Sequence, residues 1–547
     1  MAEVHREVET KYEVVAELQL PDLVELFGSV PRGTKAPSSE ESSWAEEGVE
    51  RQRLRATYFD TADFHLAAAG LTLRRRTGGS DAGWHLKVPM ADGSRSEIRL
   101  PLGRGATTVP ARLVAMLYAV TDGRELVPVV KIDTDRTVRH LVDEARNLAV
   151  EVADDLVTTR PVPSSGSGES PPATSWREIE VELVDGPTSL LDSLDPVLRA
   201  SGLVPARTTS KLARALGRGS LRAAGGTTAR KASTTKVAAR TKAASGKKAA
   251  SGEKARAGEV ALAYIGAQVD TIRAQDMPVR LDAEGSVHAM RVATRRLRSA
   301  LTTLGPLLDR KVTKPLGTEL RWLARVLGEA RDAEVMRARI GAAVDEERPD
   351  ARLDPAVAEG VDGELDSAYR AAHDDVVAQL SSDRYRALLD ALRALVEHPP
   401  LTDRAGRSAQ KVLPGLVAKS DARVGAAMRA AHTARDEAER ETQLHRARKA
   451  AKKARYSAES VASVFGKDAR RFAAAMEEVQ EALGDHLDAV ATRARLRELA
   501  SGTEQPGTAF TYGRLHALEE ARAQRSGELV GEAWAAARKK KLRAWLR

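Results

Sequence analysis

Residues 5–14 are His5-Arg6-Glu7-Val8-Glu9-Thr10-Lys11-Tyr12-Glu13-Val14, and this stretch decides how the first part of the chain is interpreted. Side chains on an extended strand point alternately to its two faces. Glu7, Glu9 and Lys11 therefore share one face, and the opposite face is mostly apolar. An ordinary strand would bury its apolar face and leave the charges in water. The alternative is a closed barrel with a charged interior, where the carboxylates would bind a divalent cation and the ammonium a polyanion.

Further segments with the same alternation follow along the first 216 residues. Leu71–Arg76 places Arg74 and Arg76 on one face, and Arg177–Val184 places three glutamates on one face. A sheet with one face in water seldom combines acidic strands with Arg- and Lys-bearing strands so regularly. The pattern favours an antiparallel barrel of about eight strands, with room inside for one ligand and its ion. A polar stretch, 31–48, is expected to be irregular, and the other segments predicted as strands are 54–60, 85–89, 95–100, 129–141 and 148–152.

The composition excludes several classes of protein. The chain has no cysteine, so it has neither disulfides nor thiolate metal sites. No apolar run approaches the roughly 18 residues of a membrane-spanning helix, and the first residues lack the pattern of a signal peptide. We therefore expect a cytoplasmic protein that has no membrane partner.

The net charge of +9 is confined to one segment. Residues 219–257 contain ten Lys or Arg and one Glu, and without them 76 of the 86 basic and 76 of the 77 acidic residues remain. The surrounding stretch, 217–258, lacks aromatic residues and cannot bury enough surface to fold, so we interpret it as a basic flexible linker. A polyanion site in the folded parts must come from local arrangement, and nucleic acid is not expected as a partner.

Six motifs in the first 216 residues together resemble those of the CYTH domain, the triphosphate tunnel fold. The resemblance implies a tunnel domain over residues 1–216 with the activity of an inorganic triphosphatase-like phosphohydrolase. Members of this family include inorganic triphosphatases, thiamine triphosphatases and class IV adenylyl cyclases, which work with Mg²⁺ or Mn²⁺. The motifs are Glu7-x-Glu9-x-Lys11, Tyr58-Phe59-Asp60-Thr61, Leu71-Thr72-Leu73-Arg74-Arg75-Arg76, Trp84-His85-Leu86-Lys87, Glu178-Ile179-Glu180-Val181-Glu182-Leu183 and the terminal Ser210-Lys211.

The same resemblance implies the site residues. Cations would bind phosphate oxygens and neutralise charge that develops on the transferred phosphoryl group, and carboxylates would hold one or two metal ions. The implied catalytic cations are Lys11, Arg74, Arg76, Lys87, Arg99, Arg136 and Lys211. The implied metal ligands are Glu7, Glu9, Asp154, Glu178, Glu180 and Glu182.

Two of these assignments stay open. The segment Val152-Ala153-Asp154-Asp155 departs from the Ala-Leu-Asp-x-Gly run of the family, so Glu151 and Asp155 compete with Asp154 for its role. In the last long strand, any two of the three glutamates can be the paired ligands.

Residues 259–547 have a helical pattern and contain an internal repeat. The motif His288-x-x-Arg291-x-x-x-Arg295-Arg296-x-Arg298 recurs 157 residues later as His445-x-x-Arg448-x-x-x-Lys452-Lys453-x-Arg455. Leu327-Gly328-Glu329 recurs 156 residues later as Leu483-Gly484-Asp485. Two copies of one helical unit are the simplest explanation.

Each copy carries a basic stripe, because positions i, i+3, i+7 and i+10 of a helix lie on one side. A solvated face normally mixes Glu with Lys, whereas these stripes contain no acidic residue, and this favours an anion-binding surface. The opposite, apolar stripes are Met290, Leu297, Leu301 and Leu304 in the first copy, and Ala447, Ala454, Ala458 and Val461 in the second.

This part of the chain resembles the CHAD domain, a duplicated helical domain associated with polyphosphate. The resemblance covers residues 259–547 and implies that the two basic stripes face each other across a groove. The implied polyphosphate-binding residues are His288, Arg291, Arg295, Arg296, Arg298, His445, Arg448, Lys452, Lys453 and Arg455.

Both resemblances point to phosphate chains as ligands. The expected class is α+β, with an antiparallel β-barrel tunnel followed by an all-α duplicated bundle. The expected function is metal-dependent hydrolysis of inorganic triphosphate or short polyphosphate, with polyphosphate binding by the helical half. The alternatives are a non-catalytic polyphosphate-binding protein, and a nucleotide triphosphatase or cyclase. The sequence leaves the metal, the preferred chain length and the oligomeric state open.

Overall fold

A computed structural model describes residues 3–15, 17–28, 44–90, 94–103, 108–143, 147–162, 173–208, 210–217, 255–347, 355–502 and 506–547. The chain forms two compact units, Met1–Lys236 and Val237–Arg547, and each is described by itself. The boundary between them falls within the expected linker, of which residues 218–254 lie outside the described ranges.

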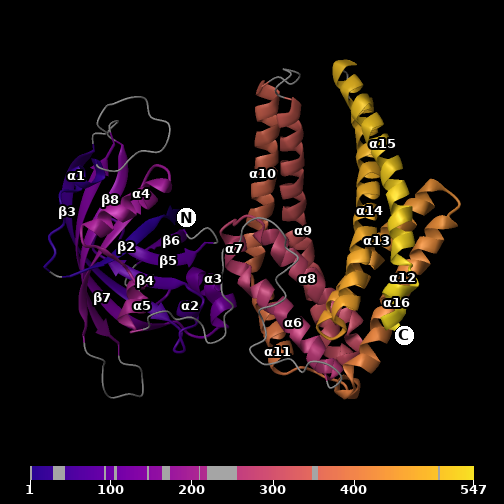
Figure 1. The fold of residues 1–547 in the computed structure, drawn as a ribbon, viewed down its shortest axis with the longest axis horizontal. Coiled ribbons are helices and arrows are strands. Elements are labelled where there is room, and N and C mark those ends of the chain that lie inside the picture. Colours follow the sequence, from indigo (N-terminus) through magenta and orange to yellow (C-terminus); the bar gives the residue numbers. More distant parts are fainter. Residues whose placement is uncertain are drawn as a thin grey trace. The chain divides into compact units, whose positions relative to one another are not determined.

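The first unit is built on one ten-stranded antiparallel sheet (Figure 1). Its strand order is β1-β6-β5-β4-β3-β7-β8-β9-β2-β10. The strands are β1 (Glu3–Glu7), β2 (Glu9–Val14), β3 (Ala45–Asp60), β4 (Thr72–Thr77), β5 (Gly83–Pro89), β6 (Arg95–Pro101), β7 (Val127–Val142), β8 (Leu148–Pro161), β9 (Ser175–Leu183) and β10 (Val204–Pro205).

The sheet curves around a cavity but is not closed by hydrogen bonds, which corrects the predicted closed barrel. The strand expected over residues 5–14 divides at Val8. Its first half, β1, pairs with β6, and its second half, β2, pairs with β9. The main-chain carbonyl of Val8 accepts a hydrogen bond from the nitrogen of Leu183 at 2.9 Å. The two sides of the sheet are thus joined by the covalent chain between β1 and β2 instead of a β-ladder.

Two strands are much longer than predicted. β3 begins at Ala45, inside the stretch expected to be irregular, and β8 continues to Pro161 instead of ending at Val152. The side chains from Glu47 to Arg51 are exposed. Both faces of this part of β3 therefore tolerate polar residues, and no alternation marks it as a strand.

Helices cover the apolar faces of the sheet. α1 (Leu23–Gly28) and α4 (Ser189–Ala200) contribute to one core with Tyr12, Ile179 and Val181. α5 (Lys211–Ala215) places Leu212 in a second core beside Tyr58 and Trp176. α2 (His65–Ala68) and α3 (Ala111–Thr121) bury Leu66, Leu113 and Leu117. The charged faces of the strands are left to line the interior.

Asp60 shows what the Tyr58-Phe59-Asp60-Thr61 motif does structurally. Its side chain is fully buried and accepts hydrogen bonds from the main-chain nitrogens of Thr61, Leu66 and Ala67 at 2.7, 2.8 and 2.9 Å. These bonds fix the start of α2 at the end of β3. The motif therefore has a structural role in this chain, since it fixes the turn from β3 into α2.

The second unit is all-helical within its described residues. Its helices are α6 (Ala257–Ala274), α7 (Asp276–Arg280), α8 (Ser286–Thr303), α9 (Arg310–Glu347), α10 (Pro355–Leu380), α11 (Asp383–Glu397), α12 (Ala409–His432), α13 (Glu437–Glu459), α14 (Ala462–Gly502), α15 (Pro506–Ala537) and α16 (Lys540–Arg543). The repeat is visible in the architecture, because α9 with α10 and α14 with α15 form two long helical pairs (Figure 1).

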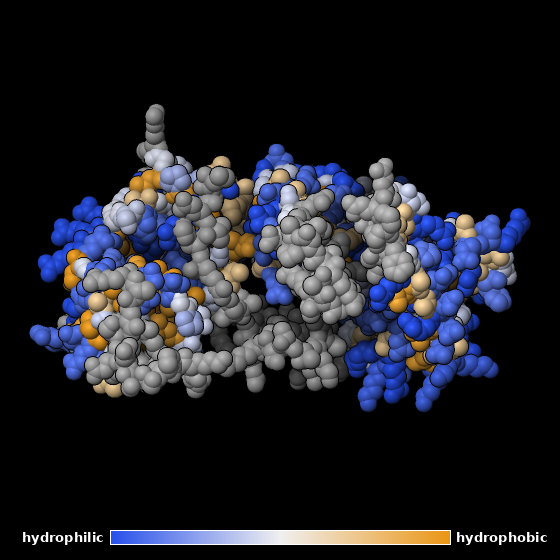
Figure 2. Space-filling model, turned by 90° about the horizontal axis from the view of Figure 1, so that it is seen from above, coloured by the Kyte–Doolittle hydropathy of each residue, from blue (hydrophilic) through white to orange (hydrophobic). Residues whose placement is uncertain are grey.

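α8 and α13 carry the repeated motif and pack against each other. The apolar stripes predicted for both helices are buried. The hydroxyl oxygens of Thr303 and Ser457 lie 2.8 Å apart between the two helices. Hydrophilic residues cover much of the described surface seen in Figure 2. None of the helices in the described ranges combines the length and the hydropathy needed to cross a membrane.

Candidate active site and polyanion surface

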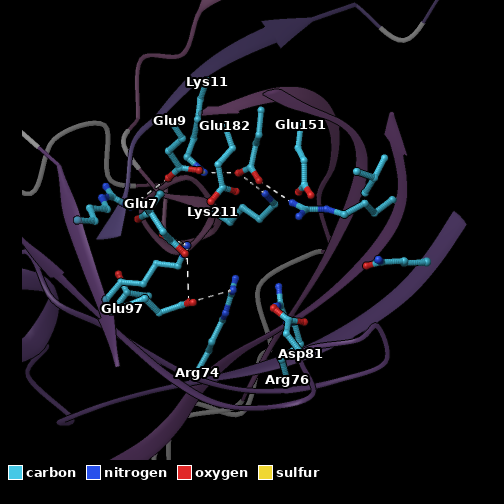
Figure 3. A pocket seen from close by; sticks show the side chains of 18 of the residues that line it. Glu7, Glu9, Lys11, Arg74, Arg76, Asp81, Glu97, Glu151, Glu182 and Lys211 are labelled. Carbon is cyan, nitrogen blue, oxygen red and sulfur yellow. Dashed lines mark hydrogen bonds and ion pairs between the residues drawn. The ribbon is translucent and has the colours of Figure 1, made fainter. Parts of the chain in front are cut away.

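The charged faces of the strands converge on a cavity of about 340 Å³ in the first unit (Figure 3). The acidic residues among its described lining are Glu7, Glu9, Glu50, Asp81, Glu97, Glu151, Glu180 and Glu182. The basic ones are Lys11, Arg74, Arg76, Lys87, Arg95, Arg99, Arg136 and Lys211. The seven cations that the sequence singled out therefore all line one cavity. Its eight acidic and eight basic side chains leave the lining without a formal net charge.

Strand register explains this convergence. Glu9 is the cross-strand partner of Glu182, and Lys11 is the partner of Glu180. On the other side of the cavity, Arg74 is the partner of His85. Because residues that are opposite each other in a ladder project to the same face, charges from distant parts of the sequence meet inside.

Glu7, Glu9 and Glu182 form an acidic edge of the cavity that lacks full compensation by cations. Nζ of Lys87 lies 2.5 Å from Oε2 of Glu7. Glu9 is paired with Lys11 at 3.1 Å through Oε2, and its buried Oε1 has no hydrogen bond, with Arg95 3.9 Å away. No ion pair of Glu182 is found in the described part of the chain. Burial, and next the charge of Glu7, raise the pKa of Glu182 to about 7. These carboxylates have the oxygen chemistry that a hard divalent cation takes, but among the described residues the group of three acidic side chains whose oxygens all lie within 4.8 Å of one another is Asp155, Glu178 and Glu180.

A second acidic cluster already contains a cation of the protein. Asp155, Glu178 and Glu180 are buried, and they could hold a metal ion, since one oxygen from each lies within 4.8 Å of the others. However, Nζ of Lys211 lies 2.9 Å from Asp155, 2.7 Å from Glu178 and 2.7 Å from Glu180. Arg136 adds contacts of 2.6 Å to Asp155 and 2.5 Å to Glu180. The ammonium of Lys211 thus occupies the position that a metal ion would take.

The position of Asp154 differs from the one predicted. β8 places Asp155 opposite Glu178 and Glu151 opposite Glu182, so these two competitors face the interior. Asp154 is opposite Ile179 and projects to the other face, where Arg177 binds it with contacts of 2.8 and 2.7 Å. Because neighbouring side chains on a strand point to opposite faces, only one of the two aspartates can face the interior. Asp155 is that residue.

Glu97 was missed as a site residue although it is fully buried in the wall of the cavity. Its Oε2 accepts a hydrogen bond from Nε of Arg99 at 2.5 Å, and Lys87 lies 3.8 Å from its Oε1. Arg74 lies 3.7 Å from the same oxygen. The signal was present in the sequence, because Glu97 alternates with Arg95 and Arg99 on one strand face.

Arg74 and Arg76 project into the cavity from the side opposite Glu9 and Glu182 (Figure 3). Arg76 is paired with Asp81. Burial, and next the charges of Arg74 and Arg136, lower the pKa of Arg76 to about 9. A guanidinium that is crowded by other cations gains from a bound anion, so this wall is the natural location for phosphate oxygens.

In the second unit, α8 and α13 bring parts of their basic stripes together. Burial, and then the charges of Arg295, Arg448 and Arg291, lower the pKa of Lys452 to about 8. Burial, and then Arg423 and Arg298, lower the pKa of Lys453 to about 8. No ion pair of Arg295, Lys452 or Lys453 is found within the described residues. His288 and His445 are exposed at the ends of the stripes.

Two arginines of the repeated motif have acidic partners, although the motif itself contains no acidic residue. Arg455 contacts Glu459 and Glu477 at 2.8 Å each, and Arg296 lies 3.1 Å from Glu459. These acids lie outside the repeated motif, so the motif alone could not reveal them. Arg296 and Arg455 are consequently held by ion pairs with glutamates on the helices.

The repeated Leu-Gly motif contributes glycines that lie beside stripe arginines. A Cβ atom added at Gly484 would lie 3.1 Å from Nη2 and 3.2 Å from Nε of Arg448. The equivalent Gly328 is roomier, since its added Cβ would lie 3.8 Å from Nε of Arg291. The Nε atoms of both arginines are buried without a hydrogen-bond partner. The second copy therefore requires glycine for steric reasons more strictly than the first.

Comparison with known proteins gives a domain family for each unit. Residues 5–215 match the CYTH domain, and residues 263–497 match the CHAD domain. An uncharacterized protein of Mycobacterium tuberculosis (strain CDC 1551 / Oshkosh) is 35% identical over 537 residues, covering 96% of this chain and 94% of its own. The solved CHAD domain from the plant Ricinus communis is 27% identical with a TM-score of 0.38, covering 55% of this chain and 93% of its own. A putative adenylyl cyclase from Hippeastrum with a dominant triphosphatase activity is 18% identical with a TM-score of 0.22, covering 39% of this chain and 95% of its own.

Proposed function

This chain belongs to the family of proteins in which a CYTH domain is followed by a CHAD domain, and from this premise we propose that its tunnel hydrolyses inorganic triphosphate or the end of a short polyphosphate with Mg²⁺ or Mn²⁺. The CHAD domain would bind longer polyphosphate. The observation that carries the proposal is the cavity lining, in which eight cations from five strands and α5 surround one space.

The balance of charge in the lining gives a reason for metal dependence. Triphosphate carries several negative charges near neutral pH, and a lining of equal positive and negative charge cannot offset them. A divalent ion held by Glu7, Glu9 and Glu182 would neutralise the acidic edge and leave the cations in excess. When bound, such an ion supplies charge neutralisation and a lowered pKa for a bound water.

The residues of the chain provide binding and orientation. Arg74 and Arg76 would bind phosphate oxygens on one wall, with Lys87 and Arg99 beside them. Lys11 would add a cation from the opposite wall, where it is paired with Glu9 and Glu180. Fixed cations of this kind stabilise the negative charge of the transition state without rearrangement. Lys211 and Arg136 are paired with the buried carboxylates of the second acidic cluster, and we assign these two cations a structural role in holding Glu180.

The lining also favours an inorganic substrate over a nucleotide. Tyr58 is the only Phe, Tyr or Trp among the described residues that line the cavity. A nucleobase would find few apolar surfaces to stack on. The alternative of a non-catalytic polyphosphate-binding protein draws support from Lys211, because it fills the acidic cluster that could otherwise hold a metal.

The test is phosphate release from tripolyphosphate by the full chain, with Mg²⁺, with Mn²⁺ and with EDTA. We expect release that depends on the metal and a much slower reaction with ATP. Binding without release in both metals would favour the non-catalytic alternative, and faster release from ATP would favour a nucleotide enzyme.

Polyphosphate binding by the CHAD domain is tested with a double charge reversal, Arg295→Glu with Lys452→Glu. These residues come from opposite stripes and lack an ion pair within the described residues, so their reversal should remove most of the affinity for long-chain polyphosphate. The exposed Lys411→Glu is the control, with the same change of sign at one site of α12. Affinity should fall steeply with salt, because a polyanion releases counterions on binding.

A further inference from the structure

His85 on β5 is buried in the wall of the tunnel, and both of its ring nitrogens face oxygen atoms. Its residue is 1% exposed. Nε2 lies 2.9 Å from the main-chain carbonyl oxygen of Asp81, and Nδ1 lies 3.0 Å from Oε1 of Glu97. A carbonyl oxygen and an ionised carboxylate can each only accept a hydrogen bond, so the single hydrogen of a neutral ring satisfies one of the two contacts. Both contacts are attractive only if a second hydrogen is present, either on the ring or on the carboxyl group.

That second hydrogen belongs on the ring and not on the carboxyl group. Burial acts to raise the pKa of Glu97, but the hydrogen bond with His85 and the charges of Lys87 and Arg74 outweigh it and lower that pKa. Arg99 also donates to Glu97 at 2.5 Å. Glu97 is therefore an ionised acceptor, and the contact as the structure has it requires Nδ1 to donate.

Two guanidinium groups act against this second proton. Burial, and then the charges of Arg74 and Arg76, lower the pKa of His85 to about 4, while Glu97 opposes them. A polyanion bound by Arg74 and Arg76 would neutralise the two charges that disfavour the imidazolium. The charged groups near the ring on the neighbouring elements are Arg74 and Arg76 on β4 and Glu97 and Arg99 on β6. The uncharged main-chain carbonyl of Asp81 faces the ring from the β4–β5 turn.

We propose that the His85 ring takes up a second proton from solvent when a triphosphate binds in the tunnel, and that the imidazolium then holds Glu97 in place through Nδ1. The inference rests on the proposed function, because it needs a polyanion in the cavity. His85 is a positioning residue in this account, since it acts through Glu97. Glu97 in turn binds Arg99 and lies near Arg74 and Lys87, so protonation of one ring steadies three of the cations that bind phosphate.

The experiment is calorimetry of the full chain with a methylene-bridged triphosphate analogue and Mg²⁺, at pH 7, in buffers of different ionisation enthalpy. The analogue resists hydrolysis, so the heat reports binding and the protons that accompany it. We expect the wild type to take up as much as about one proton more per bound analogue than His85→Gln does. The control is His65→Gln, which removes a histidine of the same unit outside the cavity and should keep the wild-type number.

A second measurement does not depend on the folding of a variant. In the wild-type complex labelled with ¹⁵N-histidine, nuclear magnetic resonance should find hydrogens on both ring nitrogens of a buried histidine. A neutral ring at His85 in the complex, or equal proton numbers for wild type and His85→Gln, overturns the inference alone. A wild-type protein that does not bind the analogue overturns the proposed function and this inference with it.

Discussion

Glu9 and Glu182 lie directly opposite each other on β2 and β9, and both side chains project into the tunnel. Like charges placed opposite each other destabilise a sheet. The pair therefore lowers the stability of the first unit. Two properties of the protein should follow from it: a pH-dependent stability without metal, and a strong dependence of activity on Glu9.

The first prediction concerns Glu182→Gln in the absence of metal. The pKa of Glu182 is raised from 4.5 to about 7, so its favourable contribution to folding is complete below pH 4.5 and is lost as the pH rises through about 7. The shift corresponds to at most about 3 kcal/mol. We expect the variant to be more stable than wild type at pH 8 and similar at pH 4.5, as measured by urea unfolding in EDTA. The exposed Glu50→Gln serves as control, and a pH-independent difference would contradict the assignment.

The second prediction is that Glu9→Gln abolishes metal-dependent phosphate release but keeps the fold. The buried Oε1 of Glu9 makes no hydrogen bond, and we expect it to bind the cation and not to support the core. Loss of a residue that orients a metal ligand typically costs about 10–100-fold in activity. Loss of a ligand itself should therefore lower activity on tripolyphosphate by roughly 100-fold or more, with an unchanged circular dichroism spectrum. Glu13→Gln changes the same strand outside the cavity and should remain active. Turnover at the wild-type rate in Glu9→Gln would exclude Glu9 as a metal ligand.

The third prediction is that Lys211→Met destabilises the first unit. The substitution leaves three buried carboxylates without their central ammonium, and breaking a buried ion pair from one side costs about 3–5 kcal/mol. Thermal unfolding should reveal the loss at pH 7, and acid should reduce it as the carboxylates take up protons. Lys131→Met, at an exposed position of β7, should have little effect. An unchanged melting temperature in Lys211→Met would mean that a metal or water can replace the ammonium.

The fourth prediction uses the internal repeat as its own control. Gly484→Ala should displace Arg448, because the new Cβ would lie 3.1 Å from its guanidinium, whereas Gly328→Ala leaves 3.8 Å to Arg291. We expect weaker binding of long-chain polyphosphate by the first variant and nearly unchanged binding by the second. Both variants are measured as full chains at one ionic strength. Equal affinities would mean that Arg448 can move without loss of binding.

The site was predictable from the sequence to the extent that it follows from alternation along strands. Lys11, Arg74, Arg76 and Lys87 line the cavity as predicted, because a period of two fixes which side chains share a face. The choice between Asp154 and Asp155 was not fixed in this way, since it depends on the register of β8 against β9. Register is a property of the assembled sheet, which local sequence does not determine.

The interior partners were less predictable than the strands. Lys211 lies among carboxylates that precede it by about 30 to 55 residues, and Arg455 contacts Glu477 on the next helix. Such contacts are set by packing between elements and leave no periodic signal. The opened sheet was missed for a related reason, because a continuous alternating stretch does not reveal that its two halves pair with different neighbours.

The division of the first strand at Val8 has a consequence for the order in which the protein can be made. β2 leaves the ribosome well before its partner β9, because Lys11 and Glu180 are 169 residues apart. At synthesis rates of about 5–20 residues per second, β2 waits roughly 10–30 s for that partner. During this interval Tyr12 and the apolar face of β2 have no sheet to cover them. A nascent chain stalled before residue 175 should therefore lack the tunnel altogether, and it should be protected by chaperones or degraded.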